Sequence, residues 1–316
     1  MIGKLAVICL LVVALRPTGI LAADLSALYA DAELGERKAR YEPRIRWNFE
    51  NLILGSLTPA ERSKLGEVRL VLPLRGQGAL RGHPMAFYAG GKTVVVPIMS
   101  VKFFDDLTLA FAYFSTKGLN LEPVADYVGM LKYRSAADIG GRFPPPLEAL
   151  GLSYDIWKTD KKVDDVSQQA LKSGLVWIMA HELGHISHGH RGYADIRADD
   201  AQRQEAAADA FANRIMRRIG VPPIGMPIFF TAMAHLEPSR GDFQSNDAWT
   251  KYLSTKATHP LTADRMVRWR TNCLPGLAIS RQTTPIWRAV YASSSLLPIT
   301  LGRSGAFWPT LIFNAP

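Results

Sequence analysis

The residues His181-Glu182-Leu183-Gly184-His185 form an HExxH pattern whose residue types and spacing suit metal chemistry. On a helix, residues four positions apart lie one turn apart on the same face, so His181 and His185 can hold one metal ion between them. Two imidazoles suit zinc and leave room for a carboxylate and a water molecule. Glu182 flanks this pair, where it can accept a proton from water at the metal.

The residues before this pattern favour a buried helix. Residues 174–180 are almost wholly apolar, as expected of a helix inside a folded core. Because HExxH is short and occurs by chance, the alternative is a pair of histidines on a solvated helix face. The apolar run argues against that alternative, and the next helix argues against it more strongly.

A second helical pattern follows and carries two acids. Glycines end the first helix, and the new pattern begins near Asp199 after a short connection, which makes the two helices antiparallel neighbours. His185 lies about 7.5 Å before the end of its helix, and Glu205 lies about 9 Å into the next. We therefore expect Glu205 level with His185, as the third metal ligand. Asp209 is then level with His181 and accepts a hydrogen bond from its outer nitrogen.

His188 is an alternative third ligand, because it lies three residues after His185 on the same helix face. In that case the carboxylate of Asp209 has no evident role. His188 and His190 also lie near a helix C-terminus, where the helix dipole favours positive side chains. For Glu205 and Asp209 themselves, the alternative is an ordinary alanine-rich helix with solvated acids. The matching register of two helices favours the metal site.

These residues resemble a known family. His-Glu-Leu-Gly-His followed by Glu-Ala-Ala-Ala-Asp is similar to the gluzincin metallopeptidases of the HtpX-like and CAAX-prenyl-protease-like family, metallopeptidase family forty-eight. The segment Thr258-His259-Pro260 and the following Asp264-Arg265-Met266 are similar to that family's His-Pro segment and its arginine. The resemblance covers roughly residues 165–270 and points to a small soluble, exported branch rather than to the members with several membrane-spanning helices.

The resemblance implies roles for two residues beyond the second helix. His259 would reach the metal site, where it binds the metal transiently or donates a hydrogen bond to the oxyanion formed from the substrate. Arg265 would assist there, or would only hold Asp264 or a helix end. The resemblance also implies protein or peptide substrates.

Residues 1–23 have the pattern of a secretory signal peptide. Lys4 supplies the positive start, residues 5–15 the apolar core, and alanines the cleavage position. The apolar run is too short to span a bilayer, and the alternative is an uncleaved anchor. We expect an exported protein, periplasmic or secreted.

The net charge of the chain indicates which binding partners to expect. Removing residues 1–23 takes away Lys4 and Arg16 and no acid, which lowers the formal net charge from +9 to +7. Such a basic surface favours an anionic membrane surface, cell-wall polymer or acidic protein. Nucleic acid is not expected, because no basic run is interleaved with aromatic residues.

The cysteine content predicts no internal disulfide. Cys9 falls in the signal segment, so Cys273 remains alone, and we expect it to be a small buried hydrophobic residue.

The pattern along the whole chain predicts an α+β, mainly α-helical, zincin-like fold with a small mixed β-sheet. Residues 24–160 form an N-terminal helical region with the sheet, residues 161–272 the metallopeptidase core, and residues 273–316 a C-terminal tail packed on the core. The N-terminal helix, 25–54, should be interrupted at Pro43. Strands are expected over 68–74, 85–88 and 93–98, the last two joined as a hairpin by a glycine turn. Further helices are expected over 101–115, 123–133, 164–188, 199–219, 224–236 and 261–271.

The prolines near these strands require that at least one strand lies at an edge of the sheet. An edge near a metal cleft would let an extended substrate pair with it, although a purely supporting sheet fits equally.

Taken together, the sequence predicts a zinc-dependent endopeptidase with one zinc ion per chain. The alternative is an exported, zinc-bound binding or chaperone-like module with little or no proteolysis. Glu182 separates the two, because a binding module needs no base at that position.

Overall fold

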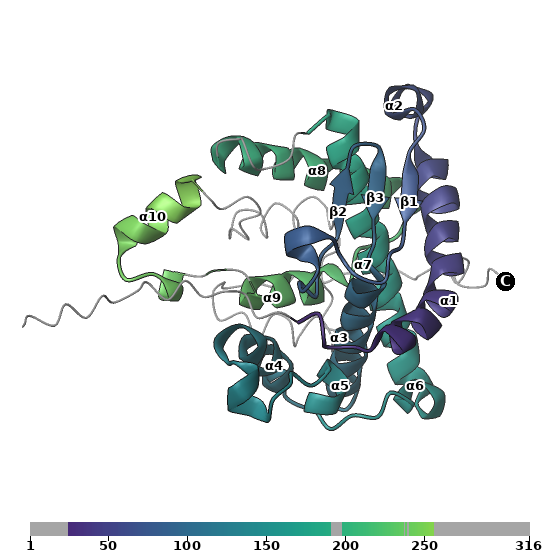
Figure 1. Ribbon diagram of the computed structural model, residues 1–316. Coiled ribbons are helices and arrows are strands. Elements are labelled where there is room, and N and C mark those ends of the chain that lie inside the picture. The colour runs from purple at the N-terminus through teal and green to yellow at the C-terminus, as the bar shows by residue number, and fades with distance from the viewer. Residues whose placement is uncertain (1–24, 191–197, 237, 239, 256–316) are drawn as a thin grey trace, which may run out of the picture.

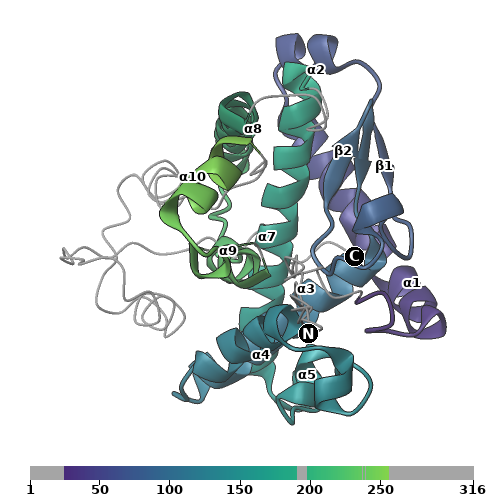
Figure 2. The same cartoon turned by 60° about the vertical axis from the view of Figure 1, so that its left-hand side comes forward.

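The computed structural model describes residues 25–190, 198–236, 238 and 240–255. Its fold is α+β and mainly helical with a small mixed sheet, as predicted. The helix α7 (Lys161–His188) runs through the middle of the molecule, and Figure 2 shows the strands on one side of it and α8 and α9 on the other. The remaining elements, seen in Figure 1, are α1 (Asp31–Trp47), a π-helix (Asn48–Ile53), 3-10 turns (Leu54–Ser56, Gly78–Leu80, Ala136–Ile139, Arg240–Asp242), α2 (Pro59–Leu65), β1 (Arg69–Val71), β2 (Tyr88–Gly90), β3 (Thr93–Val95), α3 (Ile98–Thr116), α4 (Glu122–Tyr133), α5 (Pro146–Ala149), α6 (Ile156–Thr159), α8 (Ala198–Ile219), α9 (Met226–Leu236) and α10 (Asn246–Thr255).

The sheet has the order β1-β3-β2 and packs against α7 through β2 and β3. The predicted hairpin is confirmed, although its first strand is Tyr88–Gly90 instead of 85–88. β2 and β3 are antiparallel and join at Gly91, whose φ of 58° suits a tight turn. β1 pairs with β3 in parallel, which makes the sheet mixed. Pro73 and Pro97 fall just beyond the ends of β1 and β3, so neither removes a hydrogen bond from a strand interior. Within the described residues, β1 and β2 are the edges.

Pro43 does not interrupt the N-terminal helix, so that part of the prediction is wrong. α1 continues through Pro43 and passes directly into the π-helix. The proline removes the hydrogen bond that would reach the carbonyl of Ala39, an exposed residue. The turns on either side of it remain anchored because Tyr41 and Ile45 are buried in the core. The helix also begins later than expected, at Asp31.

A buried polar network joins the N-terminal segment and α1 to α3. The hydroxyl of Tyr29 donates to Asp106 Oδ2 at 2.8 Å, and Lys102 Nζ donates to Asp106 Oδ1 at 2.6 Å. The hydroxyl of Tyr41 donates to Asp105 Oδ2 at 2.5 Å. Burial raises the pKa of Asp106 to about 6, against the opposing effect of the Lys102 charge. The residues before α1 therefore turn into the core instead of extending the helix.

Small residues let other elements approach α7 closely. A Cβ at Gly225, just before α9, would lie 2.0 Å from the carbonyl oxygen of Ala170. The amide of Gly225 instead donates to Ser173 Oγ at 3.2 Å. Phe104 of α3 fills the space beside Gly174. α7 is thereby held from several sides, which fixes the position of its C-terminal half. No described helix combines the length and the apolar composition needed to cross a membrane.

Candidate metal and active site

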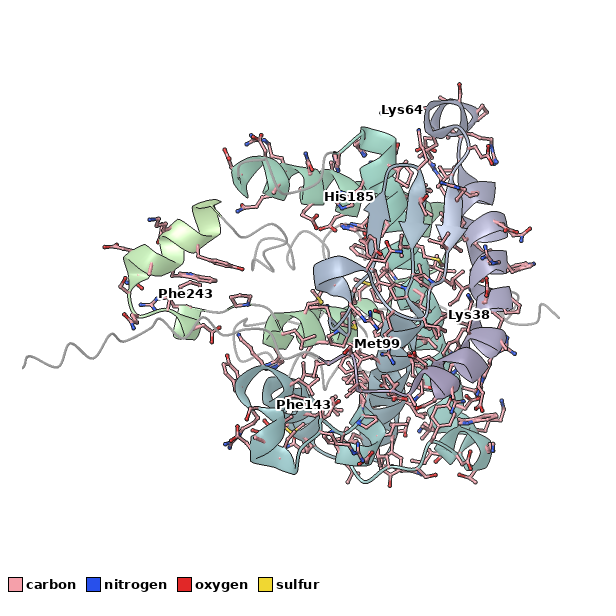
Figure 3. The ribbon with its side chains drawn as sticks, viewed as in Figure 1. Lys38, Lys64, Met99, Phe143, His185 and Phe243 are labelled. Carbon is pink, nitrogen blue, oxygen red and sulfur yellow. The ribbon has the colours of Figure 1, made fainter. Side chains whose placement is uncertain are left out.

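The HExxH residues lie in the buried C-terminal half of α7. Asp160 caps the start of this helix, where its side chain accepts hydrogen bonds from the amides of Lys162 and Val163. Further along, every residue from 174 to 187 is buried, including His181 and His185. Figure 3 labels His185 on α7, at the level of the molecule where α8 lies. The apolar run therefore positions the histidines inside the fold rather than on a solvated face.

Three side chains from α7 and α8 bring their donor atoms together. Nε2 of His181 and Nε2 of His185 lie 3.0 Å apart. Glu205 of α8 places Oε2 at 3.5 Å from Nε2 of His181 and Oε1 at 3.3 Å from Nε2 of His185. All three residues are buried, and their donor atoms lie within 4.8 Å of one another. The antiparallel register expected from the sequence is the one that the two helices adopt.

This geometry fits a metal ion. With bonds of about 2.0–2.1 Å and tetrahedral angles, two ligand atoms of zinc lie about 3.3 Å apart. The two imidazole nitrogens are 3.0 Å apart, and each lies within 3.5 Å of a different oxygen of the Glu205 carboxylate. Two imidazoles and one carboxylate are also a ligand set that catalytic zinc takes. Glu205 is only 2% exposed, and a buried carboxylate requires a compensating positive charge. The cluster can therefore hold a metal ion.

A close approach of the two helices makes this register possible. A Cβ at Gly184 would lie 3.0 Å from Cα of Ala208 and 3.1 Å from Cβ of Phe211. Gly184 lies between the two histidines in sequence, and Ala208 lies between Glu205 and Asp209. Because Gly184 has no side chain and Ala208 has a small one, the two helices approach closely, and the acids of α8 come within reach of α7.

Behind His181 lie an acid and an aromatic ring. Asp209 Oδ1 is 2.9 Å from Nδ1 of His181, the contact that the helix register predicted. Burial alone would lower the pKa of His181, but the nearby carboxylates of Asp209 and Glu205 raise it to about 10. The ring of Trp177 stacks on His181 with centroids 5.2 Å apart, and its Nε1 donates to Asn213 Oδ1 at 2.7 Å. His181 is therefore held at its outer nitrogen and on one ring face.

His190 contacts the other histidine, a contact that the sequence analysis did not foresee. Its Nδ1 lies 2.9 Å from Nδ1 of His185. Burial, with the nearby charges of His185 and His188, lowers the pKa of His190 to about 4. The signal that could have found this contact is Gly189, since a glycine that ends a helix folds the next residue back onto the last turn.

His188 does not join the cluster. Its Nδ1 donates to the carbonyl oxygen of Gly184 at 2.8 Å, so this side chain caps the helix end. The structure thus brings Glu205, rather than His188, to the two histidines. Trp177 and Asn213 were also missed, although each lies one helical turn from a site residue, Trp177 before His181 and Asn213 after Asp209.

Of the remaining predicted residues, Glu182 lies in the described part of the chain and the others do not. Glu182 is 8% exposed beside His181, and among the described residues its carboxylate forms no hydrogen bond or ion pair. His259, Arg265 and Cys273 lie outside the described residues, as do the predicted helix over 261–271, the signal segment 1–23 and the tail 273–316.

The match to a protein family agrees with the chemistry of this site. The model of the family Peptidase U49 matches residues 151–275, a segment that includes α7 and α8 and covers less than half of the chain. The match supports a peptidase, a hydrolase of protein or peptide bonds. It names peptidase U49 and not the HtpX-like or CAAX-prenyl-protease-like family that the sequence resembles. No curated protein sequence and no solved structure matches the chain.

Proposed function

We propose that this protein is a zinc-dependent endopeptidase. The observation that carries the proposal is the convergence of two imidazole nitrogens and one buried carboxylate, because one donor atom each of His181, His185 and Glu205 lies within 4.8 Å of the others. Three protein ligands leave a fourth position open, which distinguishes a catalytic zinc site from a closed structural one. The family match supports the peptidase part of this proposal.

His181, His185 and Glu205 would hold the zinc ion, which would supply a Lewis acid to polarise the scissile carbonyl group and to lower the pKa of water. Glu182, one residue from His181, accepts the proton of the attacking water and transfers it to the leaving amine. Asp209 Oδ1 lies 2.9 Å from Nδ1 of His181, where it would accept the proton of that nitrogen and leave the lone pair of Nε2 for a metal. These residues bind, orient and carry protons, and each comes from α7 or α8.

The edge strand β2 is a candidate for holding the substrate. It contacts α7 and, within the described chain, pairs with β3 on one side only. An extended peptide can add to such an edge through main-chain hydrogen bonds, which bind many sequences without selecting one. We therefore propose unfolded or extended protein segments as substrates.

We also propose that the protein acts outside the cytoplasm, in the periplasm or as a secreted enzyme. The support is the signal-peptide pattern of Lys4 and residues 5–15. The basic charge left after cleavage favours peripheral association with an anionic membrane surface or cell wall. Sequencing of the mature N-terminus should find it near Ala23 or Asp24, whereas an intact Met1 in the membrane fraction would contradict export.

Elemental analysis of ligand variants tests the metal site. The purified protein should contain about one zinc ion per chain, and His185→Ala and Glu205→Ala should each lose most of it. His188→Ala is the matched control, because it removes a neighbouring imidazole that contacts Gly184 instead of the cluster. Cleavage of an unfolded test protein should stop when a chelator removes the metal and resume when zinc returns. Zinc retention in Glu205→Ala, with loss in His188→Ala, would reject the proposed ligand set.

A further inference from the structure

The end of α7 is built so that the chain returns to a proposed metal ligand. Gly189 adopts a left-handed conformation, with φ 65° and ψ 34°, and its amide donates to the carbonyl of Ile186 at 3.1 Å. The amide of His190 donates to the carbonyl of His185 at 3.0 Å. These two hydrogen bonds define a Schellman motif, which folds the second residue past the helix back onto the helix's last turn.

In such motifs the returning residue frequently makes an apolar contact, but here it makes a polar one. Nδ1 of His190 lies 2.9 Å from Nδ1 of His185, and the two rings meet edge to face with centroids 5.0 Å apart. Both the main chain and the side chain of His190 are therefore engaged with His185. His188 stacks on His190 at a centroid distance of 5.2 Å and supports that ring.

Hydrogen-bond chemistry fixes the direction of this contact. Two imidazole nitrogens at this distance require a proton on one of them and a lone pair on the other. Nε2 of His185 faces Nε2 of His181 and the carboxylate of Glu205, so Nε2 is the atom that can bind a metal. A neutral imidazole that ligates through Nε2 keeps its proton on Nδ1. His185 is then the donor and His190 the acceptor, with the proton of His190 on Nε2.

We propose that His190 is a positioning residue of the metal centre, holding His185 in the tautomer and ring orientation that direct Nε2 at the metal. This inference rests on the metal site of the proposed function. The two histidine ligands would then differ in their support. His181 is backed by the carboxylate of Asp209, and His185 is backed by a neutral imidazole presented by the helix cap.

Metal affinity and the spectrum of bound cobalt test this role. His190→Phe keeps a flat ring but removes the acceptor, and it should weaken zinc and cobalt binding about 10–100-fold in chelator competition. It should also change the visible absorption of the cobalt-loaded protein, because the orientation of His185 is lost. His190→Gln restores an acceptor and should recover part of the affinity. His188→Phe, the matched control, makes the same substitution at an imidazole that stacks on His190 but does not contact Nδ1 of His185, and it should stay within about threefold of the wild type.

Nitrogen-15 NMR of the zinc-loaded wild type gives a readout that no folding defect in a variant can disturb. It should find a proton on Nδ1 of His185 and none on Nδ1 of His190. The opposite pattern would overturn the proposal, as would wild-type affinity in His190→Phe or an equal loss in His188→Phe. Neither measurement uses peptidase activity. A protein that binds cobalt as expected but cleaves nothing would reject the proposed function alone, and one that binds no divalent metal would reject both.

Discussion

The close approach at Gly184 makes Gly184→Ala a sharp test of how α8 delivers its acids to α7. The new Cβ would lie 3.0 Å from Cα of Ala208 and 3.1 Å from Cβ of Phe211. Carbon atoms pack at about 3.5–4.0 Å, so α8 must retreat by about 0.5 Å or more at this point. Glu205 lies one turn away on the same helix and would move with it. Metal ligands tolerate errors of only about 0.2 Å, so this displacement is enough to spoil the site.

Two effects on stability oppose each other in this variant. Alanine gains about 1 kcal/mol over glycine in a helix interior, whereas overpacking a core costs about 1–3 kcal/mol. The net loss of unfolding free energy is therefore at most about 2 kcal/mol, and the protein should still fold. The gain in helix propensity does not offset the displacement of Glu205, so metal affinity should fall by about tenfold or more. The metal site should thus be damaged more than the fold.

Denaturant unfolding and chelator competition on the same samples measure both effects. The control is Gly35→Ala in α1, where nothing lies within 4 Å of the added Cβ. It should stabilise the protein by up to about 1 kcal/mol and leave metal affinity unchanged. If Gly184→Ala bound metal as tightly as the wild type, the proposed coupling between helix spacing and the metal site would be wrong.

Three further predictions concern the surroundings of the site and the core. Asp209→Asn should weaken zinc binding by about tenfold while leaving some activity at high zinc, and unchanged affinity would contradict its contact with His181. Cobalt binding should quench tryptophan fluorescence through the ring stacked on His181, and Trp177→Phe should remove most of that response; a full response in this variant would contradict it. The pKa of Asp106, raised from 3.8 to about 6, makes the folded state lose stability as pH rises from about 4 to about 6. The stability of Asp106→Asn relative to the wild type should therefore rise by about 3 kcal/mol between pH 4 and pH 7 in denaturant unfolding, and a pH-independent difference would show that Asp106 titrates normally.

Local sequence patterns predicted most of the residues of this site. The spacing of His181 and His185, together with the register expected for two antiparallel helices, led to Glu205 and Asp209, and the structure brings all four together. These relations follow from helix geometry alone, because every residue involved lies on one of two helices joined by a short connection. The hairpin of β2 and β3 was predictable for the same reason, since its turn is local.

Contacts that depend on a third element or on a helix end were missed. A helix was expected over 101–115, but nothing in that pattern indicated that α3 would bury Lys102, Asp105 and Asp106. Their partners Tyr29 and Tyr41 come from distant positions in the chain, and no spacing rule predicts such pairings. A single buried anchor on each side of Pro43 likewise outweighed the local rule that proline breaks a helix.

The most direct test of the central claim compares the wild type with Glu182→Gln for both zinc content and cleavage of an unfolded test protein. This substitution keeps the shape of the side chain and all three proposed ligands, so about one zinc ion per chain should remain bound. Cleavage should fall by at least about a hundredfold, because the base that takes the proton from water is gone. Undiminished cleavage by Glu182→Gln with zinc still bound would mean that this metal site is not the catalytic centre.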